Sequence, residues 1–320
     1  LHLRPPHPPH AQLPLAAHLS GAHAAAIGGA SGAAYPGAYP PVDDYAFSGS
    51  QFVGSLNLAG SLSGVGYASF ADCNFNRQLI LGSGISFVKD YAFYNCSNMF
   101  GELRLPGSIE TLGDNAFRNN SSMLRLFFED GIREIGSGCF SDCSSISNAL
   151  IIPSGVDYVK AEAFSNCISI SEINIQFVEK VGKSAFENCS IATGSIGGFE
   201  DIEDRAFLNC TNLSGSESGS LPLSATGIGE GAFSGCVGFG PNLDITEAIY
   251  VGDRAFENCV GLTGSLTATK IDSISDLVFS GCGFTNLNAI GRNTEIESGI
   301  YNFYTGFGLH TGSSLSIGTD

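Results

Sequence analysis

One phrase recurs about every 23 residues along most of this chain, and it limits the fold more than any other feature. The phrase contains an aliphatic residue, often followed by Gly, then two variable residues, Ala-Phe, two further residues and Cys, as in Val88–Cys96 and Val251–Cys259. Its aromatic residue falls at Phe47, Phe70, Phe93, Phe117, Phe140, Phe164, Phe186, Phe207, Phe233, Phe256, Phe279 and Tyr301. A regular period of this length is typical of solenoids, in which each repeat buries its apolar side only by stacking on its neighbours.

A short alternation of apolar and other residues lies between the phrases, as in Leu103–Leu105 and Leu150–Ile152. Alternation over three or four residues predicts a short strand with one buried face. The Ala-Phe phrase does not alternate and is too short for a stable α-helix, so it predicts one helical turn or a 3₁₀ turn. We therefore expect residues 42–304 to form a β-rich solenoid of about twelve coils, roughly 50–60 Å long at about 4.8 Å per coil.

The phrase and the strand together follow the pattern L-x-L-P-x-S-I-x-x-I-G-x-x-A-F-x-x-C-x-x-L, which resembles the BspA-type leucine-rich repeat. The resemblance covers residues 42–304. It implies a right-handed solenoid of the α/β leucine-rich-repeat type, rich in β-structure. It also implies binding to proteins or host surfaces, because many members are adhesins on bacterial and protist cells. The resemblance implies no catalytic residue at any position of this chain.

The copies depart from this pattern in a few places. Ser50, Asn120 and Tyr304 stand where other copies have Cys, and many coils lack the Pro. A Gly/Ser-rich insertion around residues 214–220 lengthens the coil between Phe207 and Phe233. We expect stacking to be less regular at this insertion.

The two ends of the chain differ in composition from the repeats. Residues 1–41 carry five of the six histidines among Pro, Ala and Gly, which predicts a disordered linker or stalk. A Pro-x-x-Pro ligand and a histidine metal site are less favoured interpretations, because the His spacing is irregular. Residues 305–320 form a Gly/Ser-rich tail. Because the chain begins at Leu1, we expect a fragment or a processed product whose signal peptide could be missing.

The charge excludes one class of partner. The formal net charge is −17 with only 14 scattered basic residues, whereas nucleic-acid binding requires clustered Lys and Arg. No stretch approaches the roughly 20 apolar residues that span a bilayer. We therefore expect no nucleic acid partner and no membrane span in this chain.

Ten cysteines raise the question of a metal site or disulfides. Nine occupy one repeat position: Cys73, Cys96, Cys143, Cys167, Cys189, Cys210, Cys236, Cys259 and Cys282. The tenth, Cys139, replaces the Ala before Phe140. No CxxC pair exists and the repeats hold no His, so a ladder of buried thiols is favoured over zinc. Neighbouring coils lie about 4.8 Å apart, so sporadic disulfides stay an alternative. We expect no metal and no cofactor.

Two polar positions of the phrase also recur. The third position is acidic in Asp90, Asp114, Asp204, Glu230, Asp253 and Asp276. Such a row fits either a Ca²⁺ or basic-ligand site, or capping of backbone N–H groups in the following turn, which we favour. Glycosylation sequons begin at Asn95, Asn119, Asn120, Asn188, Asn209 and Asn212. The repeat itself favours Asn before Cys, so a role in the turn is the preferred interpretation.

No catalytic constellation stands out, so we expect a protein that is not an enzyme. Solenoids bind through residues that point outward from successive strands. The candidates on adjacent coils are Ile80, Arg104, Arg125 and Ile151, which alternate with apolar residues expected to be buried. The outward positions of other coils are Asn57, Asn174, Asp244, Thr267 and Asn288.

These residues predict a monomeric protein-recognition or adhesion module that binds a protein or cell-surface ligand, either at the cell surface or secreted. An intracellular, cytoplasmic scaffold for protein–protein interaction is the alternative. A β-solenoid that cleaves polysaccharides is disfavoured, because carboxylates and basic residues do not cluster on one strand face.

Overall fold

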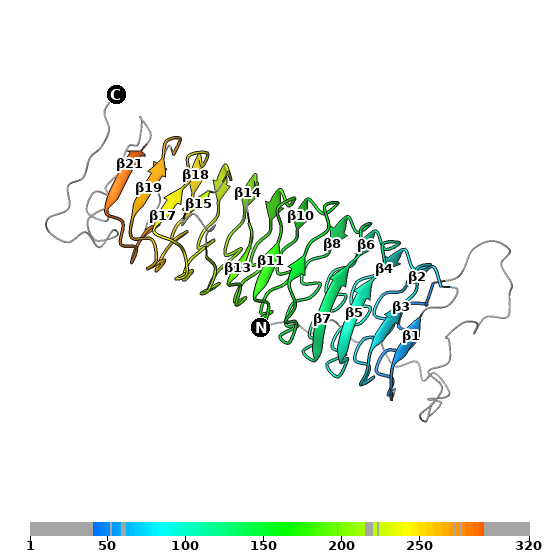
Figure 1. The fold of residues 1–320 in the computed structure, drawn as a ribbon. Helices are drawn as coiled ribbons and strands as arrows, with labels where there is room; N and C mark the ends of the chain where they lie inside the picture. The colour runs from blue at the N-terminus through cyan, green and yellow to red at the C-terminus, as the bar shows by residue number, and fades with distance from the viewer. Residues whose placement is uncertain are drawn as a thin grey trace.

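The chain forms an elongated β-solenoid in which successive coils stack along one axis (Figure 1). This computed structural model describes residues 41–290, apart from residues 52, 59–61, 197, 215–219, 223, 272 and 275–276. Eleven of the twelve predicted phrases lie within this range. The twelfth phrase, at Tyr301, lies outside the described residues. So do the predicted end segments 1–41, apart from residue 41, and 305–320. Within the described part, no helix has the length and apolar character needed to cross a membrane.

One side of ten successive coils contributes a two-residue strand to a parallel ten-stranded sheet, and Val42 of the first coil makes an isolated bridge to Val65. Its strands are β2 (Gly64–Val65), β4 (Phe87–Val88), β6 (Thr111–Leu112), β8 (Glu134–Ile135), β10 (Tyr158–Val159), β12 (Lys180–Val181), β14 (Asp201–Ile202), β16 (Gly227–Ile228), β18 (Tyr250–Val251) and β20 (Ser273–Ile274). From Val65 to Val251 the second residue of each strand is buried. The first residue therefore faces outward, because side chains alternate along a strand.

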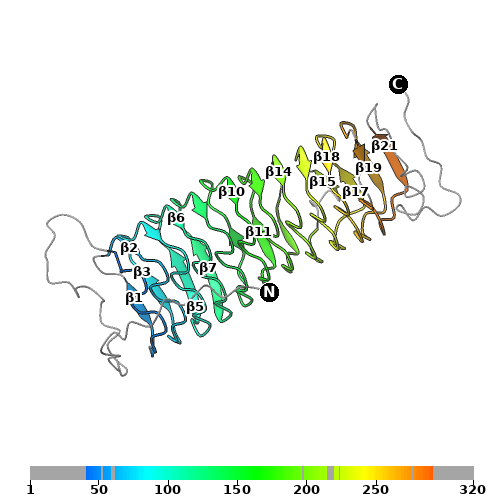
Figure 2. The same cartoon turned by 180° about the vertical axis from the view of Figure 1, so that it is seen from behind.

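The other side of the coils carries longer strands in four separate sheets, β1–β3, β5–β7, β9–β11–β13 and β15–β17–β19–β21. Their bounds are β1 (Leu56–Leu58), β3 (Leu79–Leu81), β5 (Gly101–Leu105), β7 (Met123–Phe128), β9 (Leu150–Ile151), β11 (Glu172–Asn174), β13 (Thr193–Ser195), β15 (Ser220–Pro222), β17 (Asn242–Asp244), β19 (Ser265–Ala268) and β21 (Asn286–Ile290). Figures 1 and 2 show both rows of strands running along the stack. The predicted alternation is confirmed in β1 and β3, where an exposed residue lies between two buried ones.

A column of phenylalanine rings runs between the two rows of strands. The eleven rings from Phe47 to Phe279 stack at centroid distances of 5.1–5.6 Å, with planes within 15° of parallel. The backbone N–H of each Phe from Phe47 to Phe256 also donates to a carbonyl of the next coil, at 2.7–2.9 Å. Ring burial and these hydrogen bonds together hold each coil to the next.

The Ala-Phe phrase forms a turn rather than a helix. The residue before Ala and the residue before Cys both have left-handed backbones, as at Tyr91 (φ 57°) and Asn95 (φ 56°). The N–H of Tyr94 donates to the carbonyl of Tyr91, three residues back, at 3.0 Å, as a 3₁₀ turn requires. The neighbouring N–H groups of Phe93 and Asn95 instead donate to the next coil. Of the two predicted forms, the α-helical turn is wrong and the 3₁₀ turn is confirmed by the Tyr94–Tyr91 hydrogen bond. The turn does not extend into a helix, because left-handed residues stand at both of its ends.

The ten-stranded sheet continues past the insertion near residues 214–220. In the ten-stranded sheet Ile202 still pairs with Ile228, and the rings of Phe207 and Phe233 stack at 5.2 Å. On the other side, β13 and β15 belong to different sheets, but so do β3 and β5, and β7 and β9, where the chain has no such insertion. The expected irregularity therefore does not reach the ten-stranded sheet.

Candidate functional site

The four residues singled out from the sequence all lie outward on the row of longer strands. Ile80 is 38% exposed and Ile151 is 61% exposed, and the Arg104 side chain is 59% exposed. Arg125 is exposed as well. Most of the residues flanking them are buried, including Leu79, Leu81, Leu103, Leu105, Leu126, Leu150 and Ile152.

Arg125 and Arg104 are on adjacent coils but do not pair with each other. Arg125 pairs with Glu102, whereas Phe127 pairs with Arg104. The register shifts between Gly101 and Glu102, and Leu124, which we expected to be buried, is only half-buried.

The cause of this shift lies in the core. Phe128 packs edge-on against the Phe140 ring at 5.8 Å, and this contact places Leu126 and Phe128 opposite Leu103 and Leu105. A slip of two residues keeps the same face outward, so alternation alone could not reveal it.

Phe127 is the site residue that the sequence interpretation missed. The guanidinium carbon of Arg104 lies 4.4 Å from the centroid of the Phe127 ring, and Arg104 also forms an ion pair with Glu102. The signal was the apolar run Leu126-Phe127-Phe128, in which alternation requires one aromatic residue to face outward.

The structure brings Arg104, Arg125 and Phe127 together in the β5–β7 sheet, with Ile80 and Ile151 in the sheets on either side. The break before β9 arises at Asn148, whose side chain bonds the backbone of Leu126 at 2.8 and 2.9 Å. We refer to Ile80, Arg104, Arg125, Phe127 and Ile151 as the strand-face patch.

The cysteines form the predicted ladder of buried thiols. All ten are free and buried. The Sγ of each of the nine repeat-position cysteines lies 3.0–3.2 Å from the carbonyl oxygen of a Phe in the preceding coil. Burial raises the pKa of the Cys143 and Cys189 thiols to about 12, so both stay protonated near neutral pH. The described residues contain no group of three or more His, Cys, Asp or Glu placed to hold a metal ion.

Asn120 shows what the ladder position requires. Its Nδ2 donates to the carbonyls of Phe93 at 2.9 Å and Phe117 at 2.6 Å, where other coils use a thiol. The position therefore needs a donor directed at the Phe carbonyl. The Asn120 Oδ1 is buried without a hydrogen-bond partner.

The recurring polar residues also have structural roles. Asp90 and Asp114 accept N–H bonds at 2.9 and 2.7 Å from the equivalent positions of the next coil, Asp114 and Ser137. These carboxylates therefore bond the next coil and not, as we expected, the following turn of their own coil. Asp276 lies outside the described residues. The Asn side chain one residue before the ladder position donates to a side chain of the preceding coil at 2.6–3.0 Å. These residues are Asn95, Asn166, Asn188 and Asn209, which precede Cys, and Asn119, which precedes Asn120.

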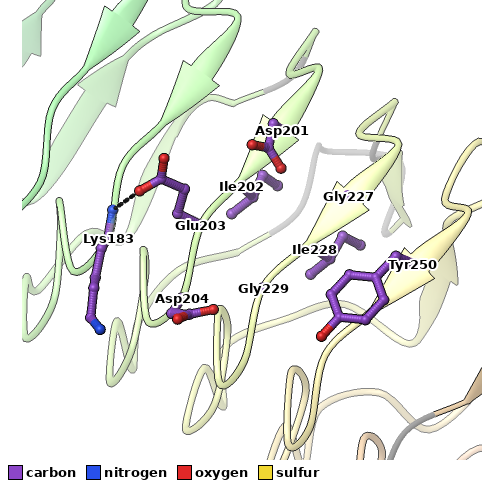
Figure 3. Close-up of a pocket in the computed structure, with 9 residues that line it drawn as sticks. All are labelled: Lys183, Asp201, Ile202, Glu203, Asp204, Gly227, Ile228, Gly229 and Tyr250. Atoms are coloured by element: carbon purple, nitrogen blue, oxygen red, sulfur yellow. Dashed lines mark hydrogen bonds between the residues drawn. The ribbon is translucent and has the colours of Figure 1, made fainter.

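A hollow opens on the outward face of the ten-stranded sheet (Figure 3). Its lining comprises Lys183, Asp201, Ile202, Glu203, Asp204, Gly227, Ile228, Gly229 and Tyr250. Burial alone would raise the pKa of the Glu203 carboxyl. Hydrogen bonds from the Lys180 ammonium at 2.9 Å and the Lys183 N–H at 2.9 Å outweigh burial, so this pKa lies below its ordinary value.

The repeat geometry agrees with a known family model. Residues 40–151, 145–239 and 197–307 match the model described as BspA type leucine rich repeat region (6 copies). The chain belongs to the BspA-type leucine-rich repeat family. No curated protein matches the chain.

Several solved structures resemble this BspA-type chain. A leucine-rich repeat protein from Bacteroides ovatus matches with a TM-score of 0.56 and 19% identity, over 81% of this chain and 70% of that protein, which supports the fold alone. A leucine rich cell surface protein from Faecalibacterium prausnitzii matches with a TM-score of 0.44 and 21% identity, over 64% of this chain and 73% of that protein.

Proposed function

We propose that this protein is a non-enzymatic recognition or adhesion module that binds a protein or cell-surface ligand through the strand-face patch. The observation that carries the proposal is the outward cluster of Arg104, Arg125 and Phe127 on paired strands, flanked by the exposed Ile80 and Ile151. Arginine and aromatic residues are enriched among interface hot spots. Membership of the BspA-type family supports a location at the cell surface or outside the cell.

The strand-face patch contains one arginine that its neighbours hold in place and one that makes no ion pair among the described residues. The contacts of Arg104 with Glu102 and the Phe127 ring hold its guanidinium in place, which lowers the entropy cost of binding. Within the described residues Arg125 makes no ion pair, so its charge is open to a partner carboxylate. We propose that the protein acts as a monomer, which sedimentation at its mass of 33.3 kDa would test.

An intracellular scaffold for protein–protein interaction remains the second candidate function. The observation that favours it is the ladder of ten free cysteines, because disulfides are rare where glutathione keeps thiols reduced. The full-length reading frame separates the two candidates: a signal peptide or an anchor favours the surface module.

Adhesion of protein-coated beads to cultured cells tests the surface proposal. Arg104→Glu/Arg125→Glu should lose most of the adhesion, because the patch loses both cationic groups. Arg133→Glu/Arg254→Glu is the matched control, since it makes the same charge change at exposed positions outside the patch. If the patch variant adheres as well as the control, this face is not the site.

A further inference from the structure

Five outward residues follow one another along the ten-stranded sheet in an order that suggests a second binding surface. Tyr158 pairs with Lys180, Lys180 with Asp201, Asp201 with Gly227, and Gly227 with Tyr250. This row lies on the other row of strands from the strand-face patch (Figure 1). Asp201 therefore stands at the centre, with an aromatic residue two strands away on each side.

On one side of Asp201, the Lys180 side chain occupies the space between the Asp201 carboxylate and the Tyr158 ring. The Lys180 ammonium lies 5.3 Å from the centroid of the Tyr158 ring and 3.3 Å from the Asp201 Oδ2. Glu203 adds a second carboxylate at 2.9 Å and accepts a hydrogen bond from the Tyr158 hydroxyl at 3.3 Å. An ammonium between an aromatic ring and carboxylates is a stable arrangement, because both the ring face and the carboxylates attract it.

On the other side of Asp201 there is again an aromatic residue two strands away, Tyr250. The residue between Asp201 and Tyr250 is Gly227, which has no side chain. Asp201 and Tyr250 are two strand spacings apart, about 9.6 Å, which is room for one side chain. A Cβ at Gly227 would meet only the Asp201 carboxylate, at 2.8 Å from Oδ1. By contrast, a Cβ at Gly229 would lie 2.4 Å from the backbone nitrogen of Asp204. Backbone packing thus explains Gly229 but does not require Gly227.

The charge and exposure of the hollow favour a cationic occupant. Three carboxylates line it, those of Asp201, Glu203 and Asp204, against one ammonium, that of Lys183, in a chain of net charge −17. The facing wall is Tyr250, which is 53% exposed, with the neighbouring Ile249 at 50%. Figure 3 shows Asp201, Asp204 and Tyr250 around the opening beside Gly227. A partner would therefore meet negative charge and an aromatic face together.

We propose that this hollow receives an arginine or lysine side chain of a partner protein, held between Asp201 and the Tyr250 ring as Lys180 is held between Asp201 and Tyr158. With the occupant in place, the row reads aromatic residue, cation, carboxylate, cation, aromatic residue, symmetric about Asp201. This surface is independent of the strand-face patch, so either can fail without the other.

The test uses N-acetyl-arginine methylamide as the probe and N-acetyl-citrulline methylamide as its uncharged isostere. NMR of ring-labelled tyrosine follows Tyr250, whose signals are identified by their loss in Tyr250→Phe. The arginine probe should shift these signals saturably, and citrulline should bind at least about fivefold more weakly, since it lacks the cation.

Gly227→Lys places the protein's own ammonium in the hollow and should abolish the saturable shift. Thr111→Lys adds the same charge at an exposed outward position of the same sheet and should leave the shift in place. The proposal is overturned if the shift does not saturate, if citrulline binds as tightly as arginine, if Gly227→Lys still binds, or if Thr111→Lys abolishes binding equally.

Discussion

At the scale of single residues, each repeat position has a physical requirement that more than one residue type can meet. Cys and Asn both supply a donor to the Phe carbonyl, but Asn120 also buries an oxygen that finds no partner. The sequence showed that Asn120 departs from the pattern. It could not show the cost, because that depends on what surrounds Oδ1.

Asn120→Cys should raise the free energy of unfolding by about 1 kcal/mol. The change removes a buried oxygen that lacks a hydrogen bond, which costs about 1–3 kcal/mol, and keeps a donor toward Phe93. Urea unfolding under reducing conditions measures the effect. The reverse change at a well-packed position, Cys236→Asn, should destabilise the protein. A loss of stability in Asn120→Cys would contradict this view of the ladder.

The buried thiols should make stability depend on pH above about 9. The pKa of Cys143 and Cys189 rises from 9.0 to about 12 in the folded chain. Between these values the unfolded chain loses protons that the folded chain keeps, so the free energy of unfolding falls as pH rises, by about 1.4 kcal/mol per thiol and pH unit. Below pH 9 this stability is fully present.

Urea midpoints at pH 8, 9 and 10 in reductant measure this slope. The double variant Cys143→Ala/Cys189→Ala serves as the comparison, because it removes two of the titrating groups and should show a shallower decline. Equal slopes in the two proteins would mean that these thiols do not carry the pH dependence.

At the scale of the repeat element, the phenylalanine column is expected to dominate stability. Phe117 is fully buried and stacks on Phe93 at 5.2 Å and on Phe140 at 5.3 Å. Phe117→Ala should therefore cost about 3–5 kcal/mol by opening a cavity. Phe100→Ala is the control, because Phe100 is 55% exposed and its loss should cost under about 0.5 kcal/mol. Similar unfolding midpoints for the two variants would contradict this role.

The period of the repeat and its buried positions could be predicted from the sequence, but the pairing of neighbouring coils could not. The alternation Leu124-Arg125-Leu126 looks like Leu103-Arg104-Leu105, yet the structure pairs Leu126 with Leu103. Packing of Phe128 on Phe140 decides between registers that leave the same face outward. The left-handed backbone conformation within the turn could not be predicted either. Residues as different as Tyr91, Glu162 and Asn95 adopt it, so no residue type marks these positions.

The hollow beside Gly227 was also beyond prediction from the sequence. Gly is common throughout the repeats, so nothing marked Gly227 as different from Gly229. The difference appears only when Asp201 and Tyr250 are seen on the neighbouring strands.

At the scale of the whole molecule, the coils are expected to form one continuous stack. Both proposed binding surfaces consist of side chains from several coils, so each needs its coils in a fixed register. The insertion near residues 214–220 is the place where continuity is most at risk. There the Phe207 N–H still donates to the Ala232 carbonyl at 2.8 Å, as other coils do.

Hydrogen exchange at the backbone N–H groups of the phenylalanine column tests this continuity most directly. We expect slow exchange at similar rates for five of these amides, because each is buried and bonded to the next coil: Phe93, Phe140, Phe186, Phe207 and Phe233. Fast exchange at Phe207, with slow exchange on either side, would show that the stack is broken at the insertion and would contradict the continuous solenoid.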